Sequence, residues 1–188
     1  MKRIIIIASG NGSNAENIIT YFKEKGTAEV THVFSNKMGA KVLQRAINHH
    51  VKALHFDRES LYKSNEILHI IKDANPDLIV LAGFLWKFPE NIIAAYPNKI
   101  INVHPALLPK YGGKGMYGSH VHNAVFANQE TVSGITIHYV NENYDEGAII
   151  FQAETTVGDA KDASEIAARI HKLEYEHFPK VIEKLLSE

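Results

Sequence analysis

The chain has 188 residues, of which 45% are apolar and 22% are charged, and its formal net charge is -1. This length and apolar content are typical of one compact α/β domain, and the near-neutral charge gives no electrostatic reason to expect nucleic acid or an anionic membrane as a partner. The absence of cysteine excludes disulfides, thiolate catalysis and zinc-thiolate sites. Because no signal-peptide pattern or membrane-length apolar run is found, we expect a cytoplasmic protein.

Strands and helices alternate over the first part of the chain. A continuous β-branched run from Arg3 to Ala8 predicts a strand buried on both faces, followed by a glycine-rich turn and a helix that ends at Gly26. The alternation then repeats, with predicted strands at 30–34, 53–56, 77–82 and 100–104, and predicted helices at 40–48, 65–74 and just after Pro89. Such alternation implies right-handed crossovers, and therefore a Rossmann-like, mostly parallel sheet with helices on both faces.

The pattern changes after residue 130. Residues 135–140 alternate between apolar and polar types, which predicts a half-exposed strand, and a turn-rich loop at 141–147 leads to a further strand at 148–153. We expect these strands to form an antiparallel addition to the sheet. Residues 162–186 have apolar residues at helical spacing, so the predicted architecture is a single domain that spans 1–188.

Polar and glycine-rich segments follow three of the predicted strands. They are Ser9–Asn14, Ala82–Trp86 and Asn102–Pro105. Open parallel sheets bind ligands at the edge where the carboxyl ends of the strands meet. We therefore expect these segments to converge on one site.

The first of these segments is typical of a phosphate-binding turn. Gly10 and Gly12 allow a sharp turn, and Ser13 and Asn14 lie where a helix begins, so that free N–H groups and the helix dipole favour an anion. The spacing also fits a dinucleotide-binding loop, but the strand predicted at 30–34 is not followed by the acidic residue that would hold the ribose. An ordinary strand-to-helix turn, capped by Ser13 or Asn14, fits the same residues.

Asn102 and His104 are candidates for acid–base chemistry. Residues two apart on a strand project to the same face, and an amide with an imidazole can stabilise an oxyanion and transfer protons. Pro105 restricts His104 to extended conformations. A polar strand end that is satisfied by loop backbone is the alternative interpretation, and Asp145, considered alone, is typical of a turn residue.

The histidines also permit a metal-site interpretation. His120 and His122 could join His104 and His138, but no paired carboxylates at ligand spacing accompany them. We therefore predict no metal site.

Taken together, these segments resemble the folate-dependent formyltransferases, and among them the group that acts on glycinamide ribonucleotide. The resemblance covers nearly the whole chain, and its most specific part is Asn-x-His-Pro-x-Leu-Leu-Pro at 102–109 followed by an aspartate downstream. The matching stretches are 9–14, 34–37, 81–84, 102–111, 134–140, 145–147 and 152–153.

The resemblance implies the reaction and its catalytic residues. A formyl group would pass from the cosubstrate 10-formyltetrahydrofolate to the amine of glycinamide ribonucleotide, a step of de novo purine biosynthesis, and no metal would be required. Asn102 and a protonated His104 would stabilise the oxyanion of the tetrahedral intermediate. Asp145 would support the imidazolium and move protons through water.

The resemblance also implies how the substrates bind, with the N-terminal half of the domain holding the ribonucleotide and the C-terminal half holding folate and the catalytic residues. The residues implied for the ribonucleotide are Gly12, Ser13, Asn14 and, on the last helix, Glu174. The residues implied for the folate pocket are Leu85, Trp86, Phe88, Ile93, Ile100 and Val140, and plain core packing could also explain them.

The chain departs from the family pattern at two places. Trp86 stands where many members carry arginine, so the folate contact there must differ. The glycine-rich stretch 112–117 is longer than in familiar members, which leads us to predict a mobile flap beside the site.

Other members of the family and one different class of protein remain as alternatives. A formyltetrahydrofolate hydrolase usually has an additional N-terminal domain, for which the start of this chain leaves no room. A methionyl-tRNA formyltransferase would need a further C-terminal domain and a basic surface, whereas a sugar-nucleotide formyltransferase would share the catalytic residues. A non-catalytic nucleotide-binding module would explain only the glycine loop. We expect a monomer or weak homodimer.

Overall fold

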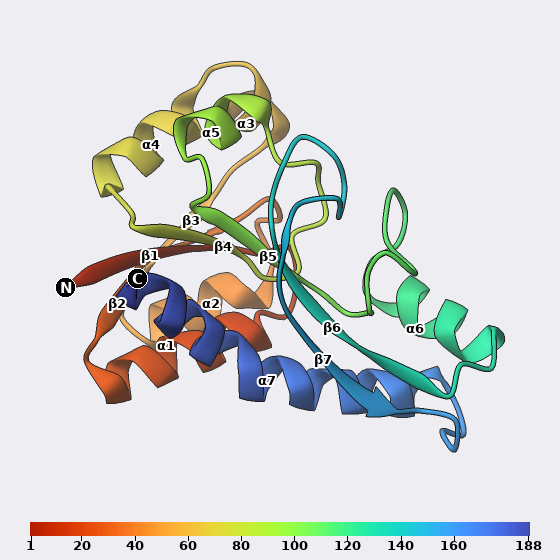
Figure 1. Cartoon of the computed structure of the whole chain (residues 1–188). Coiled ribbons are helices and arrows are strands. Elements are labelled where there is room, and N and C mark those ends of the chain that lie inside the picture. Colours follow the sequence, from red (N-terminus) through yellow and green to blue (C-terminus); the bar gives the residue numbers. More distant parts are fainter.

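A mixed seven-stranded sheet forms the centre of the protein, as seen in the computed structural model, which describes residues 1–188 (Figure 1). The strand order is β3-β2-β1-β4-β5-β6-β7. The strands are β1 Lys2–Ile7, β2 Ala28–Ser35, β3 Lys52–His55, β4 Leu78–Leu81, β5 Ile100–His104, β6 Val132–Tyr139 and β7 Ile149–Thr156. Strands β1 to β5 are parallel, and β6 and β7 add to the sheet in antiparallel fashion. The predicted Rossmann-like fold with an antiparallel C-terminal addition is confirmed.

Helices cover both faces of this sheet (Figure 1). They are α1 Ser13–Lys25, α2 Lys41–Asn48, α3 Arg58–Tyr62, α4 Glu66–Ala74, α5 Glu90–Ala95, α6 Ser119–Ala127 and α7 Ala163–Ser187. Side chains of β1 alternate between the two faces: Ile4 and Ile6 pack with α1, α2, α6 and α7, whereas Ile5 and Ile7 pack with α3, α4 and α5. All four isoleucines are fully buried, which explains why β1 has no polar residue in this run.

The last helix packs against the first one through a row of hydrogen bonds. Asn17 on α1 donates to the carbonyl of Tyr175 on α7 (3.0 Å), and the Tyr21 hydroxyl donates to Glu183 (2.5 Å). Helix α7 also packs against α6 and against both antiparallel strands. The two ends of the described chain are therefore joined along one side of the sheet (Figure 1).

The strand predicted at 135–140 is present as part of β6, but the prediction that it is half-exposed was wrong. Residues Ile135 to His138 of β6 are each at most 2% exposed. The polar residues of the alternating pattern face protein groups instead of water: Thr136 Oγ1 donates to the Ala106 carbonyl (2.7 Å) and accepts from the Leu108 N–H (2.9 Å). The alternation of apolar and polar residues in this strand therefore reflects an apolar core on one face and polar protein groups on the other, and both faces are buried.

Two helices are absent from the sequence prediction. Helix α3 begins at a capping box, in which Asp57 accepts from the Ser60 N–H and the Ser60 hydroxyl accepts from the Asp57 N–H. Helix α6 begins after Gly118, whose φ of +50° turns the chain out of the preceding loop. No helix in the structure has both the length and the apolar character needed to cross a lipid bilayer.

Candidate functional site

The carboxyl ends of β1 and β4 are connected directly. The Ser9 N–H donates to the Gly83 carbonyl (3.0 Å), and the Leu85 N–H donates to the Ser9 hydroxyl (3.0 Å). The same hydroxyl donates to Asn36 Oδ1 (2.6 Å), which brings in the end of β2. Because β5 lies next to β4 in the same orientation, its terminal residues reach the same edge of the sheet.

Asn102 and His138 meet across the junction between the parallel and antiparallel strands. They are directly opposite in the β5–β6 register, and Asn102 Nδ2 lies 3.1 Å from His138 Nε2. The other ring nitrogen, His138 Nδ1, is 2.8 Å from the Tyr139 carbonyl, which can only accept, so Nδ1 carries a proton. In the neutral ring Nε2 therefore accepts one N–H of the Asn102 amide, and the second N–H of that amide stays free.

Asp145 lies between the two buried imidazoles. Its Oδ2 is 3.6 Å from His104 Nδ1 and its Oδ1 is 3.6 Å from His138 Nε2, separations that are longer than a direct hydrogen bond. The Gly113 N–H donates to Oδ2 at 3.0 Å. Burial alone would raise the pKa of Asp145, but protons on the neighbouring imidazoles of His138 and His104, together with the Gly113 N–H, favour the carboxylate and hold this pKa below its ordinary value. The carboxylate is therefore ionised beside both rings.

His104 is oriented by the loop that follows β5. The side chain is 4% exposed, and Nε2 donates to the Tyr111 carbonyl at 2.7 Å. Nδ1, which faces Asp145, is then the nitrogen that can take up a proton. Burial lowers the pKa of His104, and the charge of Asp145 offsets only part of this effect. The free protein thus favours a neutral imidazole whose basic nitrogen faces a carboxylate.

The glycine loop presents the start of α1 to this edge. Gly12 is the N-cap of α1, with φ of +76°, and no side chain caps the helix, so the predicted alternative of a turn capped by Ser13 or Asn14 is wrong. The first amides of a helix have no acceptor within it and remain available to an anion. Arg45 on α2 holds the loop in place, because its guanidinium donates to the carbonyl oxygen (2.9 Å) and to Oδ1 (3.1 Å) of Asn11.

Glu174 on α7 connects the loop to the last helix. It is 5% exposed, and its Oε2 accepts from Asn14 Nδ2 at 2.8 Å and from His171 Nδ1 at 2.9 Å. His122 on α6 lies in the same region and is 6% exposed, with no partner for its buried Nδ1. Burial lowers the pKa of His122, and the charges of His171 and His104 lower it further.

The apolar residues implied for folate form a mixed group. Phe88 and Ile100 are buried in the core on the face covered by α3, α4 and α5, and Trp86, Ile93 and Val140 pack against this core while partly exposed. Leu85 is the most exposed of these six residues, with 36% of its surface accessible. Core packing thus accounts for Phe88 and Ile100, and apolar surface beside the carboxyl end of β4 remains at Leu85 and Trp86.

Trp86 has a structural role that its position alone did not reveal. Its ring is 6.3 Å from the ring of Tyr62 and 6.4 Å from that of Phe84, and the Arg58 guanidinium lies 4.6 Å from its centroid. The cation and the two aromatic rings hold the indole at the edge of this face.

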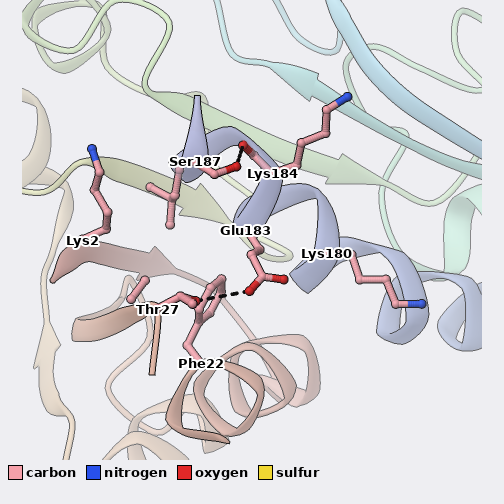
Figure 2. Close-up of a pocket in the computed structure, with 9 residues that line it drawn as sticks. Lys2, Phe22, Thr27, Lys180, Glu183, Lys184 and Ser187 are labelled. Carbon is pink, nitrogen blue, oxygen red and sulfur yellow. Dashed lines mark hydrogen bonds between the residues drawn. The ribbon is translucent and has the colours of Figure 1, made fainter. Parts of the chain in front are cut away.

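A cavity of about 580 Å³ lies elsewhere, at the amino ends of the parallel strands (Figure 2). Lys2, Lys180 and Lys184 line it, but Figure 2 shows their ammonium groups pointing away from one another. The one carboxylate in its wall, Glu183, accepts from Tyr21 and from Thr27. The cavity therefore offers no converging groups, and the chemistry is at the opposite edge of the sheet.

The structure brings Asn102, His104 and Asp145 together, and sequence reasoning missed the groups that orient them. His138 was considered only as a possible metal ligand, yet it contacts both Asn102 and Asp145. The backbone of the loop after β5 supplies an acceptor for His104 and a donor for Asp145. The β5–β6 register would have found His138, whereas no sequence signal marks backbone groups.

Comparison with known proteins agrees with this geometry. The family profile described as formyl transferase matches residues 2–182. The chain is 36% identical to phosphoribosylglycinamide formyltransferase of Bacillus subtilis, over 99% of this chain and 95% of that protein, and 37% identical to the Escherichia coli protein of the same name, over 95% and 84%. A solved structure of glycinamide ribonucleotide transformylase 1 from Geobacillus kaustophilus superposes with a TM-score of 0.88 at 33% identity and covers 99% of both chains. On these findings and on its fold, the chain belongs to the formyl transferase family.

Proposed function

We propose that this protein transfers the formyl group of 10-formyltetrahydrofolate to the amine of glycinamide ribonucleotide, giving formylglycinamide ribonucleotide and tetrahydrofolate in de novo purine biosynthesis. The observation that carries the proposal is the ionised Asp145 between two buried imidazoles, opposite a side-chain amide with a free N–H. The names of the relatives support the same reaction. We also propose that residues 1–188 form a single domain, with the ribonucleotide held by the N-terminal half.

The ribonucleotide would be held at two points. Gly12, Ser13 and Asn14 would present backbone N–H groups to its phosphate at the positive end of α1. Glu174 would accept a hydrogen bond from the amine at Oε1, since both protein donors go to Oε2. This arrangement fixes the amine near the carboxyl end of β5.

The formyl donor would bind over the apolar surface at Leu85 and Trp86. Ile93 and Val140 would contribute to this surface, with Phe88 and Ile100 supporting it from the core. A flat pterin ring suits such a surface because it buries apolar area on one face and leaves its polar edges to backbone groups. This placement directs the formyl carbon toward Asn102 and His104.

The chemical step follows from the positions of the protons. The amine nitrogen attacks the formyl carbon, and the free N–H of Asn102 donates to the developing oxyanion. The imidazole of His104 takes up at Nδ1 the proton that the amine loses, and Asp145 stabilises the resulting imidazolium. As the bond from the formyl carbon to N10 of the folate breaks, this proton passes from His104 to N10 through water. One oxyanion donor contributes about 2.7–4 kcal/mol to such a step, and a positioned acid–base group roughly 10²–10⁴-fold.

The test is release of tetrahydrofolate from a mixture of protein, glycinamide ribonucleotide and 10-formyltetrahydrofolate without added metal. His104→Ala should lose turnover by about 10²–10⁴-fold while still binding the ribonucleotide. His69→Ala, an exposed change on α4, is the matched control and should behave as wild type. Release without the ribonucleotide would favour the hydrolase, and release only with sugar-nucleotide amines would favour the sugar enzyme. Nucleotide binding without any release would favour the binding module.

The flap at 112–117 and the cellular setting remain part of the proposal. Tyr111, just before the flap, and Gly113, within it, are the two backbone positions that bond the catalytic side chains, so closure over substrate would coincide with ordering of these side chains. Slower hydrogen exchange in this stretch on substrate binding would support a lid, and equal exchange would contradict it.

We further propose a cytoplasmic monomer or weak homodimer with small-molecule partners only. Sedimentation at several protein concentrations would test the oligomeric state.

A further inference from the structure

Two catalytic side chains are bonded by the same short piece of backbone. The Tyr111 carbonyl accepts from His104 Nε2 at 2.7 Å, and two residues later the Gly113 N–H donates to Asp145 Oδ2 at 3.0 Å. The segment lies close to the carboxylate along its length, since a Cβ added at Gly112 would be 3.4 Å from Cβ of Asp145. The position of this backbone therefore decides how both side chains are oriented.

Tyr111 has a backbone conformation that a tyrosine seldom adopts. Its φ of +57° is in the left-handed region, where a bulky side chain is an outlier. Such a conformation persists only when the surrounding structure holds it in place. The contacts of the Tyr111 side chain supply that support.

The hydroxyl group of Tyr111 is anchored in the turn between α6 and β6. It donates to Glu130 Oε1 at 2.8 Å and accepts from Asn128 Nδ2 at 3.0 Å. Lys110 Nζ reaches the same Glu130 oxygen at 3.2 Å. The ring, which is partly buried, packs against the core on the side of α6 and α7. The side chain therefore cannot turn away without losing a donor, an acceptor and apolar contact.

The proton positions in this anchor are settled by its charges. Hydrogen bonds from Tyr111 and Lys110 lower the pKa of Glu130. Burial raises the pKa of the Tyr111 hydroxyl, and the hydrogen bond to Glu130 raises it further. The carboxylate is therefore ionised and the hydroxyl remains a donor over the whole pH range in which an imidazole titrates.

We propose that Tyr111 is a positioning residue, whose side chain, held by Glu130 and Asn128, keeps in place the backbone that orients His104 and Asp145. With the carbonyl fixed, the imidazole keeps its proton at Nε2 and leaves Nδ1 free to take up the proton of the amine. The role in catalysis rests on the proposed function, whereas the orientation of the imidazole is a property of the free protein. The simpler explanation is a surface hydrogen bond that stabilises the loop and leaves the imidazole unaffected.

The first experiment needs no turnover. NMR of the free protein with 15N-labelled histidine reports which ring nitrogen of His104 carries the proton, and the loss of its signals in His104→Gln assigns them. Wild type should show the Nε2–H tautomer. Tyr111→Phe removes only the hydroxyl and should give a mixture of tautomers and a lower pKa for His104, because the carbonyl contact that raises it is weakened. The other charged or titratable groups that act on this imidazole, Asp145, His138 and Glu174, stay unchanged in the variant.

The second experiment measures kcat and KM for formyl transfer. Tyr111→Phe should lower kcat roughly 10- to 100-fold with both KM values nearly unchanged, because the reacting groups are misaligned while no substrate contact is lost. Glu130→Ala should act in the same way, whereas Glu130→Gln keeps an acceptor oxygen and should retain most of the wild-type kcat and tautomer. The matched control is Tyr21→Phe, which removes a hydrogen bond of the same kind, to Glu183, that no catalytic side chain shares. It should leave kcat and the tautomer of His104 unchanged.

The outcomes separate the inference from the function on which it rests. If the wild-type protein transfers no formyl group to the ribonucleotide, the proposed function is wrong, and the NMR titration still decides whether Tyr111 orients His104. If the protein is active but Tyr111→Phe keeps a single tautomer and the wild-type kcat, the inference is overturned. A lower Tm with an unchanged tautomer would overturn it as well, because the anchor would then serve stability alone. If Tyr111→Phe does not fold, Glu130→Ala compared with Glu130→Gln tests the same anchor.

Discussion

Replacing Gly12 by alanine should destabilise the protein because this glycine is confined both by its conformation and by its neighbours. Its φ of +76° is in the left-handed region, which costs an alanine about 1–2 kcal/mol. A Cβ at this position would overlap Cγ2 and Cβ of Val42 and lie 2.7 Å from its Cα, and overpacking of this kind costs about 1–3 kcal/mol. The sum of about 2–5 kcal/mol corresponds to a fall in Tm of roughly 4–20 °C for a chain of this size.

Thermal unfolding measures this loss, and Gly10→Ala in the same loop is the matched control. A Cβ at Gly10 would meet no atom within 4 Å, so that variant should be as stable as wild type or gain about 0.4–1 kcal/mol. Adding Val42→Ala to Gly12→Ala should recover part of the loss, since the methyl groups are removed while Cβ and Cα stay. Calorimetric titration should also show weaker ribonucleotide binding by Gly12→Ala. If Gly12→Ala has the same Tm as wild type, or if adding Val42→Ala restores none of the lost Tm, the reasoning from close contact is refuted.

The site supports three further predictions. Asp145→Asn should lower the pKa of His104 further, because the carboxylate is the charge that opposes burial, and an NMR titration that showed a rise would contradict the geometry. Arg45→Met should raise the KM for the ribonucleotide about 2- to 10-fold with kcat nearly unchanged, because two hydrogen bonds that hold Asn11 are lost. Steady-state kinetics with each substrate varied measures both constants, and a fall in kcat with an unchanged KM would contradict this prediction. Burial holds the pKa values of His104 and His122 below the ordinary histidine value, so the unfolded chain binds protons more readily than the folded protein. The free energy of unfolding should therefore be highest above the ordinary histidine pKa and should fall as the pH drops through the lower folded-state values. Urea unfolding at about pH 8 and about pH 5.5 checks the sign, and His122→Leu should flatten the fall.

The parallel part of the fold could be predicted because its signals are local. The apolar run of β1 and the glycine at the end of α1 each determine their element without knowledge of distant residues. The misread strand β6 shows the limit. Thr136 and His138 occupy the alternate positions that normally face water. Only the packed structure shows that the Ala106 carbonyl meets Thr136, and that the Tyr139 carbonyl and the Asn102 side chain meet His138.

The candidate site could be predicted as a set of residues but not as an arrangement. Strand spacing places Asn102 and His104 on one face, and the family resemblance adds Asp145. The proton positions depend on partners that sequence does not mark, such as the carbonyl of Tyr111 and the N–H of Gly113. Those partners decide which nitrogen of His104 is basic, and therefore how the chemistry can proceed.

The hydrogen bond between Asn14 and Glu174 joins residues that are 160 positions apart. A contact of this range forms only after nearly the whole chain has been ordered, because the entropy of closing so long a loop must be overcome first. The part of the site proposed to hold the ribonucleotide is therefore completed late in folding, when α7 docks on α1. A ribonucleotide held between the two helices would slow the departure of α7, so that substrate should protect the protein against unfolding more than its affinity for either helix alone would suggest.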